Sequence, residues 1–415
     1  MDRHNKDDLV DALDRARLSP AGADELDASA AEDYLGIKRS SLYTYVSRGL
    51  LRGLRRSGHR GRLYSIAELR RFERARSTGG LEGYSASSLS STDLLGRVGE
   101  WPLAGQSGQG AAITEVLGLQ VEHLAEQLWT GERPLDPPPW NPRGLGLIPL
   151  DIAAVLPAGA SPLDCLPLAL SALAIRDEDR FGAPPEAELY RARRLCLRLA
   201  ALLAMSNDVA RCSVALRSEA FAGVFLSALG VDDRSSRRAF VDAALGLAAL
   251  QPAGPADEVV ALSSASGADL YSSLLAGVAL MSAPEGVGAC ARVEALVIEC
   301  EGVGGAAAAV SARFRRGDEI PGFVERSTSD TDRAASGAGL LAALRSFPDA
   351  APALLPLAEL VDFMENSGRG RLRLPVVLVA LERGLALPRG SAEALLVLGR
   401  ILPWVGLVLR ERRRT

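Results

Sequence analysis

The sequence predicts a mainly α-helical protein, in which a small basic module is followed by a large all-α body. Apolar residues recur three and four apart through the body, which is the spacing of amphipathic helices. Alternating β-branched residues, which mark half-buried strands, are nearly absent from it. Positive charge is concentrated near the N-terminus. These observations favour two parts with separate tasks.

The composition is that of a globular protein. The chain has 415 residues, of which 48% are hydrophobic and 24% are charged. A chain of this length and apolar content buries a sizeable core and has room for about two or three domains. Disorder along the whole chain is therefore excluded.

Charge is segregated along the chain. Residues 37–76 hold twelve basic residues against Glu68 and Glu73, a net charge of +10, and since the whole chain carries −4, the rest carries −14. A strongly basic segment beside an acidic body is typical of a polyanion-binding module attached to a larger domain.

Cysteine usage and hydropathy predict a soluble cytoplasmic protein with no membrane partner. The five cysteines include no C-x-x-C pair and lie mostly among apolar residues, as buried thiols in a reducing compartment do. The N-terminus lacks the apolar stretch of a signal peptide, and no uninterrupted apolar run reaches the roughly 18 residues that a membrane span needs. The cysteines are Cys165, Cys196, Cys212, Cys290 and Cys300.

Histidine is confined to the first third of the chain, at His4, His59 and His123. The last 292 residues contain none, so a catalytic imidazole or a His-ligated metal is excluded there within a single chain. We expect no metal site. A serine triad would lack its histidine, and GVGG at 302–305 lacks the Lys and Ser/Thr of a phosphate loop.

The basic module is predicted to begin with a short helix. Residues 1–26 are acidic and helix-permissive, and we assign them no role. The pattern then predicts a helix over Ala30–Leu35, capped by a side-chain oxygen of Asp27 or Ser29. Gly36 ends this helix.

A second helix, capped by Ser40 or Ser41 and stopped by Gly49, is predicted after a tight turn. Its apolar face consists of Leu42, Tyr45 and Val46. Residues 50–65 then predict a two-stranded hairpin with a basic tip. A third helix over 66–76 follows, and its inward residues are Ile66, Leu69 and Phe72. The order helix, turn, helix, wing, helix results.

Residues 27–76, with AAEDYLGIKRSSLYTYVSRGLL followed by GRLYSIAELRRF, resemble the winged helix-turn-helix of mercury-resistance-regulator (MerR) and excisionase type. The resemblance implies double-stranded DNA as the partner, with the second helix in the major groove and basic groups on phosphates. The alternative is a solvated basic face on a partner-binding domain. The DNA-facing residues predicted in the second helix are Lys38, Arg39, Ser40, Ser41, Tyr43, Thr44 and Arg48, and those in the wing are Arg52, Arg55, Arg56, Arg60 and Arg62.

A Ser- and Gly-rich linker is predicted over residues 77–92, before an all-helical body over 93–415. Three stretches of the body resemble citrate synthase in the order of that family. They are QVEHLAEQLWTGERP at 120–134, ASGADLYSSLLAGVALMSAPEGVGA within 243–297, and PLAELVDF followed by LPRGSAEALLVLGRILPWVGLVL near the C-terminus. The resemblance implies an all-α fold with a large and a small domain, and some family members carry an appended winged helix.

The resemblance implies an acyl-CoA condensation in which an Asp removes a proton from acetyl-CoA and histidines hold the enol and oxaloacetate. Each of these histidines is replaced in this chain. The residues that match them are Gln251, Gly286, Glu325 and Leu407. Since general acid–base partners and oxyanion donors each contribute about 100- to 10,000-fold, the loss predicts negligible turnover.

Three groups of the family's site remain at matching positions. Asp362, in LVDF, matches the base, and Arg333 and Arg400 match two arginines that bind the anionic substrate. The alternative for Asp362 is a structural cap or ion pair, and for both arginines a surface ion pair. A third arginine is not recognisable in the C-terminal RERRRT, and Glu325 would repel a dicarboxylate.

The preferred hypothesis is a DNA-binding protein whose body is a citrate-synthase-like homodimer and a pseudoenzyme. An anionic metabolite or an acyl-CoA bound near Arg333 and Arg400 would regulate it, with no cofactor otherwise expected. The alternative is an active citrate or 2-methylcitrate synthase with an altered site, an acyltransferase of the tricarboxylic acid cycle type, acting alone or in a complex with an intact paralogue. A third alternative is a scaffold without a ligand.

Overall fold

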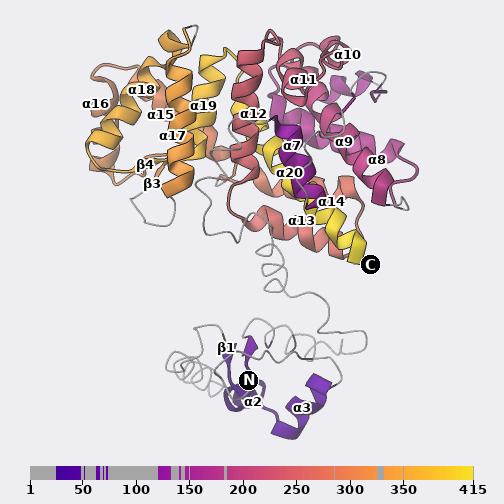
Figure 1. The fold of residues 1–415 in the computed structure, drawn as a ribbon. Coiled ribbons are helices and arrows are strands. Elements are labelled where there is room, and N and C mark those ends of the chain that lie inside the picture. Colours follow the sequence, from indigo (N-terminus) through magenta and orange to yellow (C-terminus); the bar gives the residue numbers. More distant parts are fainter. Residues whose placement is uncertain are drawn as a thin grey trace. The chain divides into compact units, whose positions relative to one another are not determined.

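The structure is a computed structural model of the chain, which divides into two compact units, Met1–Leu95 and Gly96–Thr415 (Figure 1). The structure describes residues 25–47, 51, 62–65, 69, 72, 120–131, 140–141, 145–148, 150–181, 185–284, 286–324, 331–348 and 350–414. The predicted linker over 77–92 lies outside these residues.

The first unit contains β1 (Glu25–Leu26), α2 (Ala28–Leu35), α3 (Arg39–Ser47) and β2 (Tyr64–Ser65). Helix α2 is capped by Asp27, whose carboxylate accepts a 2.8 Å hydrogen bond from the Ala30 N–H, and it begins two residues earlier than predicted. Gly36 ends α2 with a positive φ of 61°, a conformation that costs glycine nothing.

Helix α3 differs from the prediction at its start. It begins at Arg39, so Ser40 and Ser41 lie within its first turn and are not the cap. The Lys38 carbonyl accepts hydrogen bonds from the N–H groups of Ser41 and Leu42 and so closes the first turn. The residue that precedes the helix is therefore Lys38. Gly49, the predicted stop, lies outside the described residues.

A small core holds the first unit together. Leu26, Leu35 and Leu42 pack with Tyr64, and the ring of Phe72 lies 4.8 Å from that of Tyr45. Leu69 and Phe72, predicted to face inward, are fully buried. Strand β2 pairs antiparallel with β1, which lies in a segment where no strand was predicted. The predicted wing tip lies outside the described residues.

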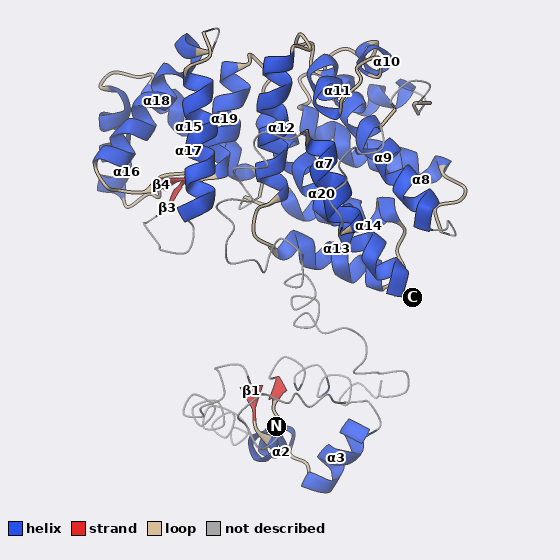
Figure 2. Ribbon diagram, viewed as in Figure 1, coloured by secondary structure: helices blue, strands red, loops and turns tan. Residues whose placement is uncertain are grey.

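The second unit is almost entirely helical in its described part (Figure 2). A two-stranded antiparallel ribbon of β3 (Phe323–Val324) and β4 (Arg371–Leu372) lies among the later helices. The first helices are α7 (Val121–Thr130), η1 (Leu150–Val155), η2 (Pro162–Asp164), α8 (Cys165–Arg176), α9 (Pro185–Leu202), η3 (Leu203–Ser206), α10 (Arg211–Ala215) and α11 (Phe221–Ala228). They are followed by α12 (Ser235–Ala249), α13 (Pro255–Ala265), α14 (Leu270–Met281), α15 (Gly288–Cys300), α16 (Gly305–Arg316), α17 (Thr331–Arg345), α18 (Ala351–Asn366), α19 (Leu374–Gly384) and α20 (Ser391–Arg414).

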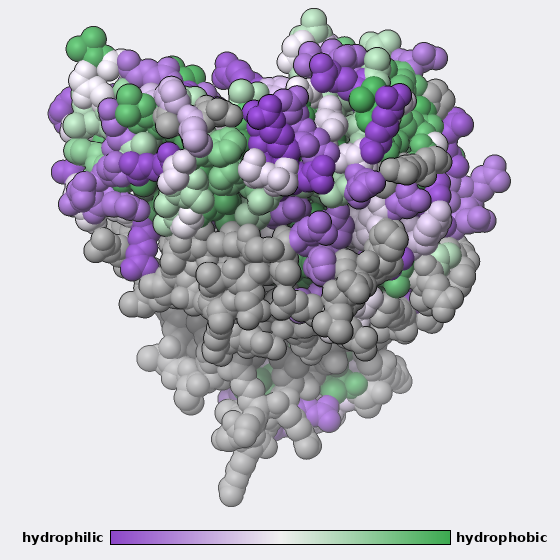
Figure 3. Space-filling view, turned by 45° about the horizontal axis from the view of Figure 1, so that its top comes forward, coloured by the Kyte–Doolittle hydropathy of each residue, from purple (hydrophilic) through white to green (hydrophobic). Residues whose placement is uncertain are grey.

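The helices of the second unit form two groups. Helices α15 to α19 lie on one side and α7 to α11 on the other, with α12 between them (Figure 1). Polar and apolar residues are interspersed over the described part of the surface that Figure 3 shows. The apolar interior consists mainly of residues on the helix faces that are turned toward neighbouring helices.

Helix α20 is the central element of this unit and packs against α7, α9, α12, α13, α14 and α19. It is long and apolar enough to cross a membrane, yet 94% of that apolar window is buried within the unit, as in a core helix. Two glycines permit its close approach to other helices. A Cβ on Gly399 would lie 2.4 Å from the Ala248 Cβ, and one on Gly406 would lie 2.8 Å from the Leu128 carbonyl oxygen.

Two carboxyl groups are buried together where α7 meets α12. Asp242 accepts a 3.2 Å hydrogen bond from the Val121 N–H, and Glu122 accepts a 2.7 Å bond from the Phe221 N–H. The second oxygen of Glu122 has no partner. Burial raises the pKa of Asp242 to about 8, with the nearby Glu122 adding to the effect, and burial also raises the pKa of Glu122. The Asp242 carboxyl therefore holds a proton at neutral pH.

The protonated carboxyl predicts a pH-dependent stability. Because the pKa of Asp242 is higher in the folded than in the unfolded chain, the folded state binds more protons between about pH 4 and pH 8. The free energy of unfolding therefore falls as the pH rises through that range. Asp242→Asn, which keeps the acceptor for Val121, should flatten this slope. It should raise the free energy of unfolding at pH 8 by several kcal/mol, since one pKa unit corresponds to about 1.4 kcal/mol, as measured by urea unfolding.

Asp151→Asn, at an exposed position of η1, is the matched control and should leave the slope unchanged. The same slope in the wild-type protein and in Asp242→Asn would contradict the assignment.

Candidate functional site

The positions that match the family's catalytic site come from four described parts of the second unit. Gln251 follows α12, Gly286 lies in the turn after α14, Asp362 lies on α18 and Arg400 on α20. Arg333 lies in the first turn of α17, but its side chain lies outside the described part, as does Glu325.

Arg400 is buried, and its guanidinium is engaged inside the fold. Its side chain is 7% exposed and forms an ion pair with Asp257, which is 3% exposed. The same guanidinium donates a 2.9 Å hydrogen bond to the Gln251 carbonyl and a longer one to the Ala248 carbonyl. An anionic ligand would therefore compete with a buried carboxylate for this group.

Asp257 has two further partners. It accepts a 3.0 Å hydrogen bond from the Trp404 indole N–H and a 2.8 Å bond from the Gly254 N–H. The second bond satisfies a free N–H at the start of α13. Asp257 thereby joins the start of α13 to two side chains of α20, and the bond from Arg400 to Gln251 fixes the intervening turn.

Gln251 lies two residues after the end of α12 and supports that turn. Its side-chain amide donates a 3.0 Å hydrogen bond to the Leu247 carbonyl, one turn back in the helix. Its own backbone carbonyl accepts from Arg400. Both of these groups are therefore paired within the fold.

The backbone around Gly286 leaves no space for a side chain. A Cβ at this position would lie 2.2 Å from the Met281 carbonyl oxygen, well inside contact distance. That oxygen also accepts a 2.9 Å hydrogen bond from the Val287 N–H, which closes the turn. A histidine at residue 286 would require this turn to open.

Asp362 lies in a two-bond ion pair with Arg345, at 2.9 and 3.0 Å. The Asp362 side chain is 49% exposed. The pair with Arg345 stabilises the charged form of Asp362, which makes it a weaker base. No histidine lies on α18 or on the helices packed against it. Leu407, which matches a further histidine, is buried on α20.

Metal and thiol chemistry find no support in the described part of the second unit. No group of three or more His, Cys, Asp or Glu side chains is placed to hold a metal ion there. All five cysteines are free and buried, and burial raises the pKa of the Cys165 thiol to about 12 and that of Cys212 to about 11. Such thiols are poor nucleophiles.

The sequence of this unit matches a known family. The model of the citrate synthase C-terminal domain matches residues 145–414, which is more than half of the chain. The chain belongs to the citrate synthase family. Because the match begins at residue 145, it does not extend to the first unit.

Solved citrate synthases share the fold. The enzyme from Thermotoga maritima MSB8 is 19% identical, with a TM-score of 0.58, and the match covers 72% of this chain and 83% of that one. The enzyme from Thermoplasma acidophilum was solved as a ternary complex with carboxymethyl coenzyme A and oxaloacetate. It is 16% identical, with a TM-score of 0.59, and the match covers 72% of this chain and 84% of that one. The Pyrobaculum aerophilum enzyme is 17% identical, with a TM-score of 0.57, and the match covers 72% of this chain and 82% of that one. No curated protein matches the chain at a significant level.

The residues predicted to face DNA are partly described. Lys38, Ser40 and Thr44 are exposed on or beside α3, Tyr43 is 47% exposed, and Ser41 is half-buried. Arg39 is exposed and lies 3.5 Å from Glu32, and Arg62 is exposed before β2. Arg48, Arg52, Arg55, Arg56 and Arg60 lie outside the described residues.

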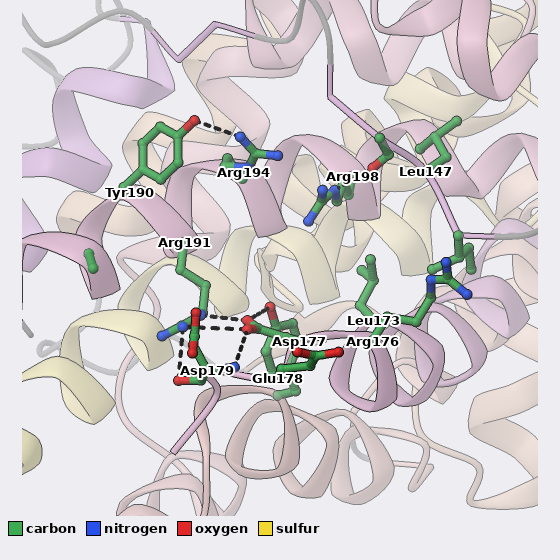
Figure 4. A pocket seen from close by; sticks show the side chains of 14 residues that line it. Leu147, Leu173, Arg176, Asp177, Glu178, Asp179, Tyr190, Arg191, Arg194 and Arg198 are labelled. Carbon is green, nitrogen blue, oxygen red and sulfur yellow. Dashed lines mark hydrogen bonds and ion pairs between the residues drawn. The ribbon is translucent and has the colours of Figure 1, made fainter. Parts of the chain in front are cut away.

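A pocket of about 560 Å³, to which the sequence pattern had not pointed, lies between α8 and α9 (Figure 4). Arg191, Arg194 and Arg198 line it from α9. Their spacing of three and four residues places them on one face of the helix, which is the signal that was available in the sequence.

The buried pair of Arg400 and Asp257 leads to a stability prediction. Asp257→Asn removes the charge that faces Arg400 and should lower the free energy of unfolding by about 3–5 kcal/mol, because it leaves a buried cation unpaired. Urea unfolding measures the change.

Asp318→Asn, which breaks an exposed pair with Arg316, is the control and should cost about 1 kcal/mol or less. If Asp257→Asn and Asp318→Asn lowered the free energy of unfolding by the same small amount, Asp257 would not be needed to balance the buried charge of Arg400.

Proposed function

We propose that this member of the citrate synthase family is a DNA-binding protein whose body does not carry out the condensation. The observation that carries the proposal is Gly286, where the family resemblance expects a catalytic histidine and the backbone leaves no space for any side chain. Asp362 and Arg400, the retained groups whose side chains are described, are both held in ion pairs within the fold.

The condensation needs a base, a donor for the enol oxygen and groups that hold the keto acid. Asp362 is the carboxylate that matches the base, but Arg345 holds it. Each missing donor or acid–base partner costs about 100- to 10,000-fold in rate. With the matching histidines replaced, little of the catalytic acceleration would remain.

DNA is the proposed partner of the first unit. Beneath α3, Leu42 is buried in the core, whereas Lys38, Arg39, Ser40 and Tyr43 are exposed. A small core that presents an exposed polar helix is what major-groove recognition requires. The basic segment over 37–76 would contact the phosphates.

We further propose that the body is a homodimer, because one such module covers only a short half-site. Exposed apolar side chains occur on three helices that pack together, at Ile175 on α8, Leu262 on α13 and Leu280 on α14. A second copy is a fitting cover for them, since apolar side chains gain by leaving water. The dimer would set the spacing of the two DNA-binding modules.

The regulatory part of this proposal concerns an acyl-CoA or an anionic metabolite. The Thermoplasma enzyme was solved with carboxymethyl coenzyme A and oxaloacetate. A similar ligand near Arg333 would regulate DNA binding if it favoured one arrangement of the two modules. The buried free thiols agree with a reducing cytoplasm as the location.

The second candidate is an active citrate or 2-methylcitrate synthase with an altered site, alone or in complex with an intact paralogue. Family membership and the exposed carboxylate of Asp362 favour it. It requires Asp362 to accept a proton while it faces Arg345, and the amide of Gln251 to replace a histidine donor.

The DNA-binding proposal predicts different effects for residues that would contact bases and for residues that would contact phosphates. Tyr43→Ala should reduce the preference for the specific site over random duplex by about 1–3 kcal/mol. Arg55→Ala or Arg60→Ala should weaken binding to all duplexes and lower the salt slope by about one unit. The specific site is first selected from a pool of random duplexes by binding to the full chain. Fluorescence anisotropy with that site and with random duplex, over a salt series, then measures both effects.

The controls address charge and dimerisation. Arg316→Ala removes an exposed cation of the second unit and should leave DNA binding unchanged. Leu262→Glu should yield monomers that lose affinity for a two-half-site duplex. Leu355→Glu, at a somewhat more exposed leucine of α18, should not. Equal losses on specific and random DNA for all module variants would show that α3 does not read the sequence.

A further inference from the structure

Three arginines occupy alternate positions in the segment that joins α18 to α19, and we call them the arginine strip. They are Arg369, Arg371 and Arg373, in the sequence RGRLRL, and strand β4 begins at the second of them. Gly370 and Leu372, which lie between them, are buried, whereas the first and third arginines are exposed and the second is half-buried. Burial therefore alternates as in an extended chain, with the three side chains on the outer face.

The backbone of the arginine strip is held by the surrounding fold. Arg371 pairs with Val324 in the antiparallel ribbon of β3 and β4, which lies near the start of α17 (Figure 1). The Arg373 N–H donates a 2.8 Å hydrogen bond to the Gly322 carbonyl, and strand β4 also contacts α18. The strip is thus part of the folded unit, so a ligand would not have to order it.

The three guanidinium groups have no carboxylate partner among the described residues. Arg369 lies over the ring of Phe314, 4.9 Å from its centre, and this cation–π contact leaves its N–H groups able to donate. The carboxylate of Asp362, on the helix that precedes the strip, is paired with Arg345. Nothing in the described part of the chain therefore neutralises the strip.

The arginine strip is a local exception in an acidic chain. Outside residues 37–76 the chain carries a net charge of −14. Elsewhere in the second unit arginines face carboxylates, as Arg313 faces Glu299 and Arg383 faces Glu294. Three unpaired cations within five residues create a positive potential at one place, which attracts a partner with several negative charges.

The geometry of the arginine strip favours a linear polyanion. An extended chain rises about 3.3 Å per residue, so the strip spans about 13 Å from its first to its last arginine. One strand of duplex DNA carries a phosphate about every 3.4 Å along the axis, so a row of this length faces about four phosphates. Guanidinium groups donate paired hydrogen bonds to phosphate oxygens. The DNA that the first unit is proposed to bind would be present at high local concentration, because both units belong to one chain.

We propose that the arginine strip is a second DNA-contact surface, which binds the phosphates of the duplex beside the site that the first unit recognises. This inference rests on the proposed DNA-binding function and extends it to the second unit. Because phosphate contacts carry no sequence information, the strip would add affinity without changing sequence preference. The affinity of the full chain would therefore depend on the length of the duplex.

Fluorescence anisotropy of the full chain tests the strip, with the selected site trimmed to its ends and with the same site extended by about ten base pairs on each side, one helical turn. The wild-type protein should bind the extended duplex at least about tenfold more tightly, with a salt slope steeper by about two units, since each contacted phosphate adds about 0.9 unit. Combining Arg369→Gln, Arg371→Gln and Arg373→Gln should abolish this gain and leave binding to the trimmed duplex unchanged.

The matched control combines Arg234→Gln, Arg313→Gln and Arg316→Gln, which removes the same charge from arginines that are paired with carboxylates. The control should keep the gain in affinity on the extended duplex. Thermal unfolding shows whether each variant is folded. If the combined strip variant does not fold, Arg373→Gln alone, at an exposed position, should lower the salt slope on the extended duplex by about one unit.

Three results would overturn the inference and leave the DNA-binding function standing. The wild-type protein could bind both duplexes with the same affinity and salt slope. The folded strip variant could keep the gain, as expected if the strip instead contacts an acidic protein. The control could lose the gain to the same degree, which would assign it to net charge. If the wild-type protein bound neither duplex, the DNA-binding function and this inference would fail together.

Discussion

The buried ion pair between Arg400 and Asp257 is the contact on which the second unit most depends. It joins the long central helix α20 to the start of α13, and Trp404 donates to the same carboxylate. Either charge alone in that interior would be very costly, so α20 and α13 are held in one relative position. Since α20 also packs against α7, α9, α12, α14 and α19, that position is transmitted through most of the fold.

This constraint has a functional consequence. In the family resemblance Arg400 is a ligand arginine, whereas in this chain its hydrogen bonds are directed at Asp257 and at the carbonyls that end α12. Asp362 is likewise paired with Arg345, and the turn around Gly286 is closed. The citrate synthase fold is thus retained, and the described side chains that match its site make contacts within that fold.

Local features were predictable because they depend on neighbouring residues. Asp27 caps α2 and Gly36 ends it, as the sequence indicates, and Leu69 and Phe72 are buried as their spacing predicts. The three family-like stretches predicted the fold of the second unit, which the family match confirms. DNA binding and the loss of catalysis stay predictions.

Contacts between distant residues were not predictable. Asp257 lies 143 residues before Arg400, and nothing in its surroundings marks it as the partner. The pairing of β1 with β2 joins residues 25–26 to 64–65, and it depends on how α2 and α3 fold between them. The pocket has the same origin, because α8, α9 and Tyr271 meet only in the folded unit.

The central claim is that this body has kept the citrate synthase fold without its condensation chemistry. The most direct measurement is CoA release from acetyl-CoA or propionyl-CoA with oxaloacetate, using the full chain purified from a host that lacks its own citrate synthase. The account predicts no release above the rate without protein. Turnover at an ordinary enzymatic rate, about 1 to 1,000 per second, would contradict it.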